Sequence, residues 1–217
     1  MKVIVLSGIS VILACTLNVA YAQGTPNGSY SAFSLSYRNT TLSTPICVAN
    51  ECHSALAGPS MLYAYQLMPN LVLGAALSSV QSTGSSSTLK STSNSFFIES
   101  VAGLGSYADV GVLLAPLATS LQACSTLIPS CTVTNDSGID IGVFGKVFLD
   151  ETQRNSIELS YDSVSYQRSA TQTFIIGLSL VTVLGDHHRF SLAAEQLQDS
   201  NGNNTSNNLG YGYSYLF

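Results

Sequence analysis

Apolar and polar residues alternate along much of this chain. Within Pro59–Met68, every second position holds a large apolar or aromatic side chain: Met61, Tyr63, Tyr65 and Leu67. Within Ser156–Gln167, Ile157, Leu159 and Tyr161 alternate with Glu158, Ser160 and Asp162. Successive side chains of a β-strand point to opposite faces, so this repeat of two predicts strands with one apolar face.

Ten segments of strand length are bounded by turn-forming residues, and each is long enough for a tilted strand that crosses a membrane, which needs about 9–11 residues. The segments are Ser29–Asn39, Pro59–Met68, Leu71–Ser82, Ser95–Gly105, Ala108–Ala118, Gly138–Asp150, Ser156–Gln167, Gln172–Leu184, His188–Gln198 and Asn208–Phe217. The pattern predicts an all-β fold, which we interpret as a closed antiparallel transmembrane β-barrel of ten strands. A soluble β-sandwich shows the same alternation, and the connections between the strands separate the two folds. Eight strands are the alternative, because His188–Gln198 alternates poorly.

The connections between these segments alternate between short and long. Short turns such as Pro69-Asn70 and Ser106-Tyr107 are separated by three long polar stretches, Thr40–Gly58, Thr83–Asn94 and Thr119–Ser137. Bacterial barrels have short periplasmic turns and longer outer loops, so we expect both termini on the periplasmic side. The brief connection at 168–171 is an exception.

Two irregularities are expected in the strands. Pro116 has no N–H to donate to a ladder, which predicts that the fifth strand ends or bulges near Ala115. Apolar residues change phase at Val164 and Tyr166, which predicts a bulge in the seventh strand.

Composition narrows the function classes. Only 9% of residues are charged, about a third of the share in soluble domains, and Ser, Thr, Asn and Gly replace them. Six Lys and Arg follow the leader, too few for a basic patch, so nucleic-acid binding is not expected. The apolar runs Val110–Leu121 and Phe174–Gly185 are too short to span as helices, and strands in lipid must close into a barrel.

Residues 1–22 are predicted to be a cleaved signal peptide, which leaves 23–217 as the barrel. Lys2 precedes the apolar run Val3–Leu17, and Ala20-Tyr21-Ala22 fits a cleavage site. A retained membrane anchor and lipoprotein processing at Cys15 are the alternatives.

Four cysteines remain in the exported chain, as the close pairs Cys47 with Cys52 and Cys124 with Cys131. Local disulfides within two outer loops are the simplest interpretation for an exported chain. Three connectivities are possible. A metal site is the alternative, but neither pair has CxxC spacing, and His53 beside Cys52 does not make a zinc site. No metal or cofactor is expected.

The last strand carries the most specific pattern. Aromatic residues alternate with small ones and end the chain: Tyr211, Tyr213, Tyr215 and Phe217. This ending resembles the C-terminal signature of bacterial outer-membrane barrels, and the whole chain resembles the small OmpA-like and opacity-type surface barrels. The resemblance implies an outer-membrane location, contact with outer-membrane lipid, and recognition of the last strand by the barrel-assembly machinery.

The phase of each strand places six charged residues in the lumen: Arg38, Glu99, Asp140, Lys146, Glu158 and Asp162. Buried charges must be paired or hydrated. A salt-bridge network that plugs the barrel is favoured over a small polar pore, because narrow barrels are filled by side chains.

An enzyme is not expected. His188, Ser191 and Glu195 resemble the residue types of lipid A deacylases, but their spacing differs, and His187 and His188 fall at the periplasmic rim. We interpret the histidines, His53 included, as solvated turn residues. The favoured function is a structural or surface-interaction barrel with disulfide-pinned outer loops and an unassigned surface ligand. The alternatives are a narrow porin-like channel for solutes or ions, and a lipid-modifying enzyme.

Overall fold

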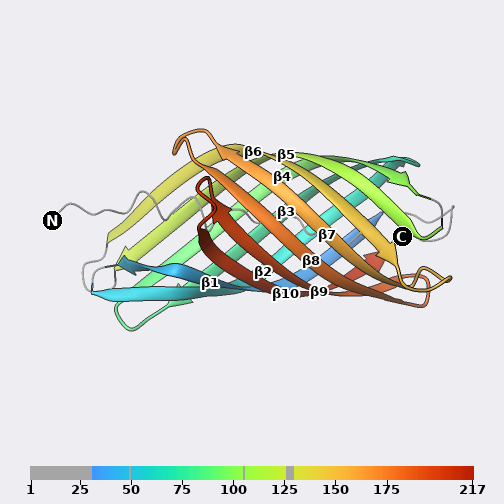
Figure 1. Cartoon of the computed structure of the whole chain (residues 1–217). Coiled ribbons are helices and arrows are strands. Elements are labelled where there is room, and N and C mark those ends of the chain that lie inside the picture. The colour runs from blue at the N-terminus through green and yellow to red at the C-terminus, as the bar shows by residue number, and fades with distance from the viewer. Residues whose placement is uncertain (1–30, 49, 105, 126–129) are drawn as a thin grey trace.

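The computed structural model describes residues 31–48, 50–104, 106–125 and 130–217, so the predicted signal peptide lies outside the described residues. In this part of the chain, ten antiparallel strands form one closed barrel (Figure 1). Their bounds are β1 Ala32–Val48, β2 Glu51–Met68, β3 Leu71–Thr83, β4 Ser87–Gly103, β5 Ala108–Ser125, β6 Ser130–Phe148, β7 Asn155–Tyr166, β8 Gln172–Leu184, β9 His188–Asp199 and β10 Asn204–Leu216. No helix in the described ranges is long and apolar enough to cross a membrane.

The barrel closes between the first and last strands. Each strand pairs with its neighbours in the chain, and β1 pairs with β10 in a register that sets Phe33 opposite Tyr215. Closure gives every strand two partners and leaves no sheet edge in the lipid. The ten-strand prediction is confirmed, and the eight-strand alternative is wrong.

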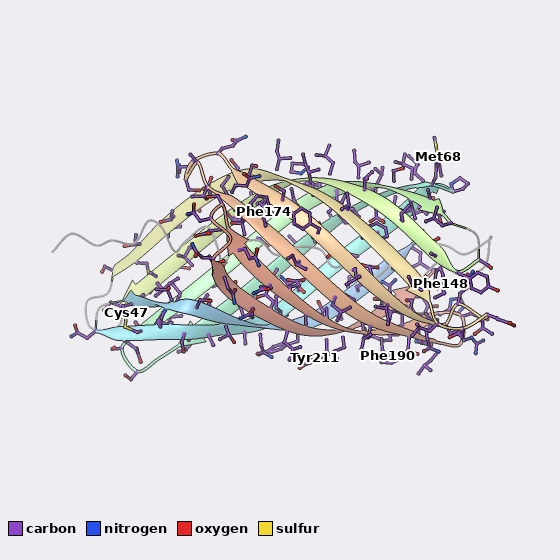
Figure 2. All side chains as sticks on the ribbon, viewed as in Figure 1. Cys47, Met68, Phe148, Phe174, Phe190 and Tyr211 are labelled. Atoms are coloured by element: carbon purple, nitrogen blue, oxygen red, sulfur yellow. A yellow bond between two sulfur atoms is a disulfide. The ribbon has the colours of Figure 1, made fainter. Side chains whose placement is uncertain are left out.

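The outer wall carries a belt of large apolar side chains. On β2 and β6 the predicted lipid-facing residues are exposed, among them Tyr63, Tyr65, Ile141 and Val143. Tyr211 and Phe190 likewise point away from the wall in Figure 2. Apolar residues outside and smaller or charged residues inside are the arrangement that lets a sheet face lipid.

Five strands are much longer than predicted. The strands β1, β2, β4, β5 and β6 have 17 to 19 residues, whereas β7 to β10 have 12 or 13. The stretches Thr40–Gly58, Thr83–Asn94 and Thr119–Ser137, predicted as loops, are therefore mostly strand. We call the projecting sheet of residues 40–48, 50–58, 79–94, 118–125 and 130–137 the outer extension; it lies at the left of Figure 1.

Neither predicted irregularity is found. β5 continues through Pro116, which keeps its register with Ile139 and turns its ring outward. On the β4 side, pairing is recorded on both sides of the proline without a change of register. β7 also keeps one register, and Val164 and Tyr166 simply face inward, where both are buried. The prediction of a bulge in β7 failed because it assumed that only polar side chains face the lumen.

Two apolar clusters fill much of the interior. The outer cluster draws on eight strands and consists of Leu42, Leu56, Val80, Leu89, Leu121, Val164, Tyr166, Ile175 and Leu197. The inner cluster lies on β2 to β5 and consists of Leu62, Ala64, Val72, Phe97, Val101, Leu113 and Ala115. The barrel therefore has a packed core in addition to its lipid-facing belt.

Candidate functional site: the lumen and the outer extension

A first charged layer lies at the end of the lumen nearest the turn between β6 and β7. Lys146 on β6 is in register with Asp109 on β5 and with Glu158 on β7, and all three are buried. Glu99 and Arg189 also lie within electrostatic range of the Lys146 ammonium group, whose Nζ is 5.2 Å from the centroid of the Phe148 ring. Opposite charges in one row offset part of the cost of burying each charge.

A second charged layer lies nearer the middle. Arg38 Nη2 is 3.4 Å from Glu195 Oε1, and Asn208 Nδ2 donates to Glu195 Oε2 at 2.8 Å. Asp140 on β6 and Asp162 on β7 are buried within electrostatic range of Glu195. A cavity of about 40 Å³ beside Arg38, Glu195 and Asn208 has room for one or two water molecules.

The six lumen charges predicted from the sequence all lie on inward-facing positions. Glu99, Asp140, Lys146, Glu158 and Asp162 are buried, and the side chain of Arg38 is 13% exposed. The sequence interpretation missed three further inward charges, Asp109, Arg189 and Glu195. The sequence could have revealed Arg189 and Glu195, because the outward Phe190 and Leu192 on β9 imply that odd-numbered positions of this strand face inward.

The outer cluster obstructs the lumen above these charges. It contains Leu56, Leu89, Ile175 and Leu197, which are among the largest fully buried side chains. β1 approaches β4 and β5, which are not its ladder partners, across the interior. A polar solute on the barrel axis would have to displace this packed apolar layer.

Two disulfides pin hairpins of the outer extension. Cys47 is bonded to Cys52 across the tip of β1 and β2, and Cys124 to Cys131 across the tip of β5 and β6. Each pair occupies directly opposed positions of its ladder. The bonds therefore join paired strands, where the sequence had suggested loops.

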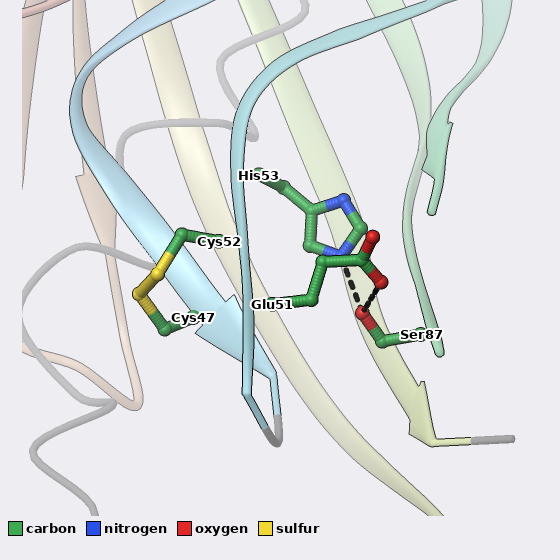
Figure 3. The surroundings of a disulfide bond; sticks show 5 residues. All are labelled: Cys47, Glu51, Cys52, His53 and Ser87. Atoms are coloured by element: carbon green, nitrogen blue, oxygen red, sulfur yellow. Dashed lines mark hydrogen bonds between the residues drawn. A yellow bond between two sulfur atoms is a disulfide. The ribbon is translucent and has the colours of Figure 1, made fainter. Parts of the chain in front are cut away.

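Beside the first disulfide, Glu51 binds the turn that connects β3 and β4 (Figure 3). Its carboxylate accepts hydrogen bonds from the amides of Ser85 and Ser86 and from the hydroxyl of Ser87, at 2.8 to 3.0 Å. Hydrogen bonds from the Ser86 and Ser85 amides and the Ser87 hydroxyl lower the pKa of Glu51 to about 2. The Glu51 carboxylate thus links the β1–β2 hairpin to the β3–β4 hairpin through charge-assisted hydrogen bonds.

His53 continues the same network into the interior. Its Nδ1 is 2.9 Å from Ser82 Oγ, and its Nε2 is 2.8 Å from Ser87 Oγ. The side chain is buried, so its interpretation as a solvated turn residue is wrong. The prediction failed because it placed His53 in a loop, whereas β2 carries the residue on an inward-facing position.

The possible acyl-hydrolase residues are not brought together. His188 lies on the outward face of β9, where its ring stacks on Tyr213 and its Nδ1 is 2.8 Å from the Tyr213 hydroxyl. Ser191 and Glu195 lie on the inward face of the same strand. Within the described ranges, no group of three or more His, Cys, Asp or Glu residues is suited to hold a metal ion.

The aromatic residues of the last strand lie on the lipid-facing side of the closure. Tyr211, Tyr213, Tyr215 and Phe217 are all exposed on the outer wall. Tyr211 stacks on Tyr37 and Phe217 stacks on Tyr63, each with ring centroids 5.9 Å apart. These contacts cover the seam where β10 meets β1.

No protein-family model matches the chain, and no curated protein matches it. Solved structures do. The translocator domain of autotransporter NalP from Neisseria meningitidis is 14% identical, with 90% of each chain covered and a TM-score of 0.54. An outer membrane channel from Pseudomonas putida F1 is 10% identical, with 93% of this chain and all of that chain covered and a TM-score of 0.52.

At these identities the likeness concerns the fold alone. The chain has the fold of a bacterial outer-membrane β-barrel. The belt of outward apolar side chains is what this fold requires in a bilayer. The two observations together place the chain in the outer membrane.

Proposed function

We propose that this protein is a surface-interaction barrel, in which the outer extension meets a partner outside the cell and the filled lumen serves as structural support. The length of β1, β2 and β4 to β6 beyond the apolar belt carries the proposal. A bare membrane anchor would need only the shorter strands seen in β7 to β10.

The outer extension is built as a rigid polar surface. Its outward positions on β4 and β5 are mostly uncharged hydrogen-bonding side chains, such as Thr88, Thr92, Ser120 and Gln122. Ladder hydrogen bonds and two terminal disulfides fix the strands that carry these side chains before a partner binds. Such preorganisation lowers the entropy cost of binding, and it favours a partner recognised by hydrogen bonds.

A shortened barrel tests this proposal. Ala118 and Ser137 are directly paired, so an Asn-Gly turn in place of residues 119–136 keeps the register of β5 and β6. Bacteria that express the shortened barrel should attach several-fold less to extracellular matrix, to abiotic surfaces or to one another. Equal attachment at equal surface level would refute the proposal.

A narrow cation channel is the second candidate. One observation favours it: six inward carboxylates, Glu99, Asp109, Asp140, Glu158, Asp162 and Glu195, face three inward cations, Arg38, Lys146 and Arg189. Planar-bilayer recordings separate the two functions. We expect no steady conductance from the intact barrel, because the outer cluster blocks the lumen. Cation-selective steps would favour the channel.

A further inference from the structure

A groove of about 580 Å³ runs along the barrel wall over the strands from β2 to β6. The middle of the groove is a row of residues that are paired from strand to strand: Ser60, Ser78, Ser93, Thr119 and Asp136. The row on one side is Met61, Leu77, Asn94 and Ala118, and the row on the other is Pro59, Ser79, Thr92, Ser120 and Asn135. These side rows occupy outward positions, so the groove lies on the outside of the barrel.

The groove is oblique to the bilayer, because the strands are strongly tilted (Figure 1). The side row that contains Met61 and Leu77 starts in the apolar belt, where Met61 is paired with Leu35. The same row ends at Ser137, whose carbonyl accepts a hydrogen bond from Gln167 N in the outer turn between β7 and β8. One end of the groove therefore lies beside the apolar belt, and the other lies beside the turn between β7 and β8.

Polarity changes along the groove in the same direction. Met61 and Leu77, which are 43% and 51% exposed, form the lipid end. The side row of Ser79, Thr92 and Ser120 presents half-buried hydroxyl groups from β3 to β5. The shape and the gradient match an amphiphile whose acyl chain lies in the bilayer and whose headgroup lies outside.

The guanidinium group of Arg168 lies at the polar end of the groove, beside Asn135. Arg168 is exposed, and its Nη1 donates to the Asn135 carbonyl at 3.1 Å, which holds the guanidinium beside the groove. Asp136 lies there too, but its oxygens accept hydrogen bonds from the amides of Ser137, Arg168 and Ser169 at 2.8 to 3.0 Å. Lys90 lies two residues beyond Thr92 on the same face of β4.

We propose that this groove binds a phosphorylated glycolipid of the outer leaflet, of the lipid A type. An acyl chain packs against Met61 and Leu77, sugar hydroxyls and amides bond to Ser79, Thr92 and Ser120, and a phosphate meets Arg168. Arg is suited to this role because its planar fork binds phosphate through two hydrogen bonds. The volume lies within the usual range for ligand pockets, about 300–1,000 Å³.

Native mass spectrometry of the detergent-folded full barrel tests the site, with lipid A and phosphatidylcholine as the probes. Lipid A should be retained at one per barrel, and phosphatidylcholine at least several-fold less. Arg168→Gln should weaken lipid A binding at least roughly tenfold, because the phosphate loses a charge-assisted hydrogen bond. Ala118→Trp should fill the groove and abolish binding.

Arg154→Gln is the matched control, because Arg154 lies in the periplasmic turn between β6 and β7. It should leave lipid A binding unchanged, and dephosphorylated lipid A should bind wild type and Arg168→Gln equally. A gel-mobility shift on boiling verifies the fold of each variant. Equal retention of both lipids, or equal losses from the two arginine variants, would overturn the proposal. Attachment of cells is a separate readout, so the two proposals can fail independently.

Discussion

A single half-buried carboxylate joins two hairpins of the outer extension. Glu51 belongs to β2, yet its oxygens bind the turn between β3 and β4. The folded pKa is about 2, against 4.5 for the unperturbed group. Its contribution to stability is therefore complete above about pH 4.5 and is lost as the pH falls through 2.

This linkage predicts a titration at the turn. The amide chemical shifts of Ser85 and Ser86, followed by NMR in detergent micelles, should change with a midpoint near pH 2. Glu51→Gln should remove this transition, because a neutral amide does not titrate. A midpoint near the ordinary value of 4.5 would show that the carboxylate does not bind the turn.

Gly58 marks a point of close approach between strands. A Cβ atom at this position would lie 2.0 Å from the backbone oxygen of Ser79, whereas one at Gly145 would meet nothing within 4 Å. Gly58→Ala should destabilise the barrel by about 1–3 kcal/mol through overpacking. The measurement is the temperature at which the folded band is lost on an SDS gel. Equal temperatures for Gly58→Ala and the control Gly145→Ala would contradict the close approach.

At the scale of the strands, the sequence is informative wherever one face meets lipid. The contrast between Tyr63 or Tyr65 outside and Ala64 inside predicts β2 there, and the same logic places β6. In the outer extension this contrast is reversed and weaker: Thr88, Lys90 and Thr92 lie on the outside of β4, and single apolar residues such as Leu89 face inward among serines. The alternation therefore fades, and strands held by ladder hydrogen bonds have the composition of loops.

The sequence predicts which charged residues face the lumen better than it predicts which apolar residues pack there. A charged residue opposite an apolar face identifies an inward position, which is why Asp140 and Lys146 were placed in the lumen. An inward Val164 or Tyr166 reverses that contrast, and only the register shows that both pack in the outer cluster. Likewise, the approach of Arg38 to Glu195 depends on closure between strands far apart in sequence.

The closing strand gives a prediction of its own. Phe217 N donates to the Ser31 carbonyl at 3.1 Å, and the ring stacks on Tyr63 across the seam. Deletion of Phe217 should reduce the amount of folded barrel in the outer membrane several-fold, because the seam loses its last aromatic contact. Phe217→Tyr, which keeps the ring, should assemble nearly as well as wild type. Fractionation of cells and unboiled gels give the yield, and an undiminished yield would exclude this role.

At the scale of the whole molecule, lumen and outer extension have different tasks. The lumen is packed with two apolar clusters and buried charges, so it stabilises the barrel from within. The outer extension is polar, hydrogen-bonded and disulfide-pinned, and it projects beyond the apolar belt. This division favours recognition at the cell surface over transport through the wall.

The two lysines that follow residue 22 allow the most direct test of this architecture. Lys90 is half-exposed on the outer extension, whereas Lys146 is 1% exposed inside the barrel. Intact cells should be treated with an amine-reactive reagent too large to cross the outer membrane, and labelled peptides should be identified by mass spectrometry. We predict that Lys90 is labelled and that Lys146 is labelled only after denaturation. An unlabelled Lys90 on intact cells, or labelling of both lysines alike, would contradict a surface barrel with a filled lumen.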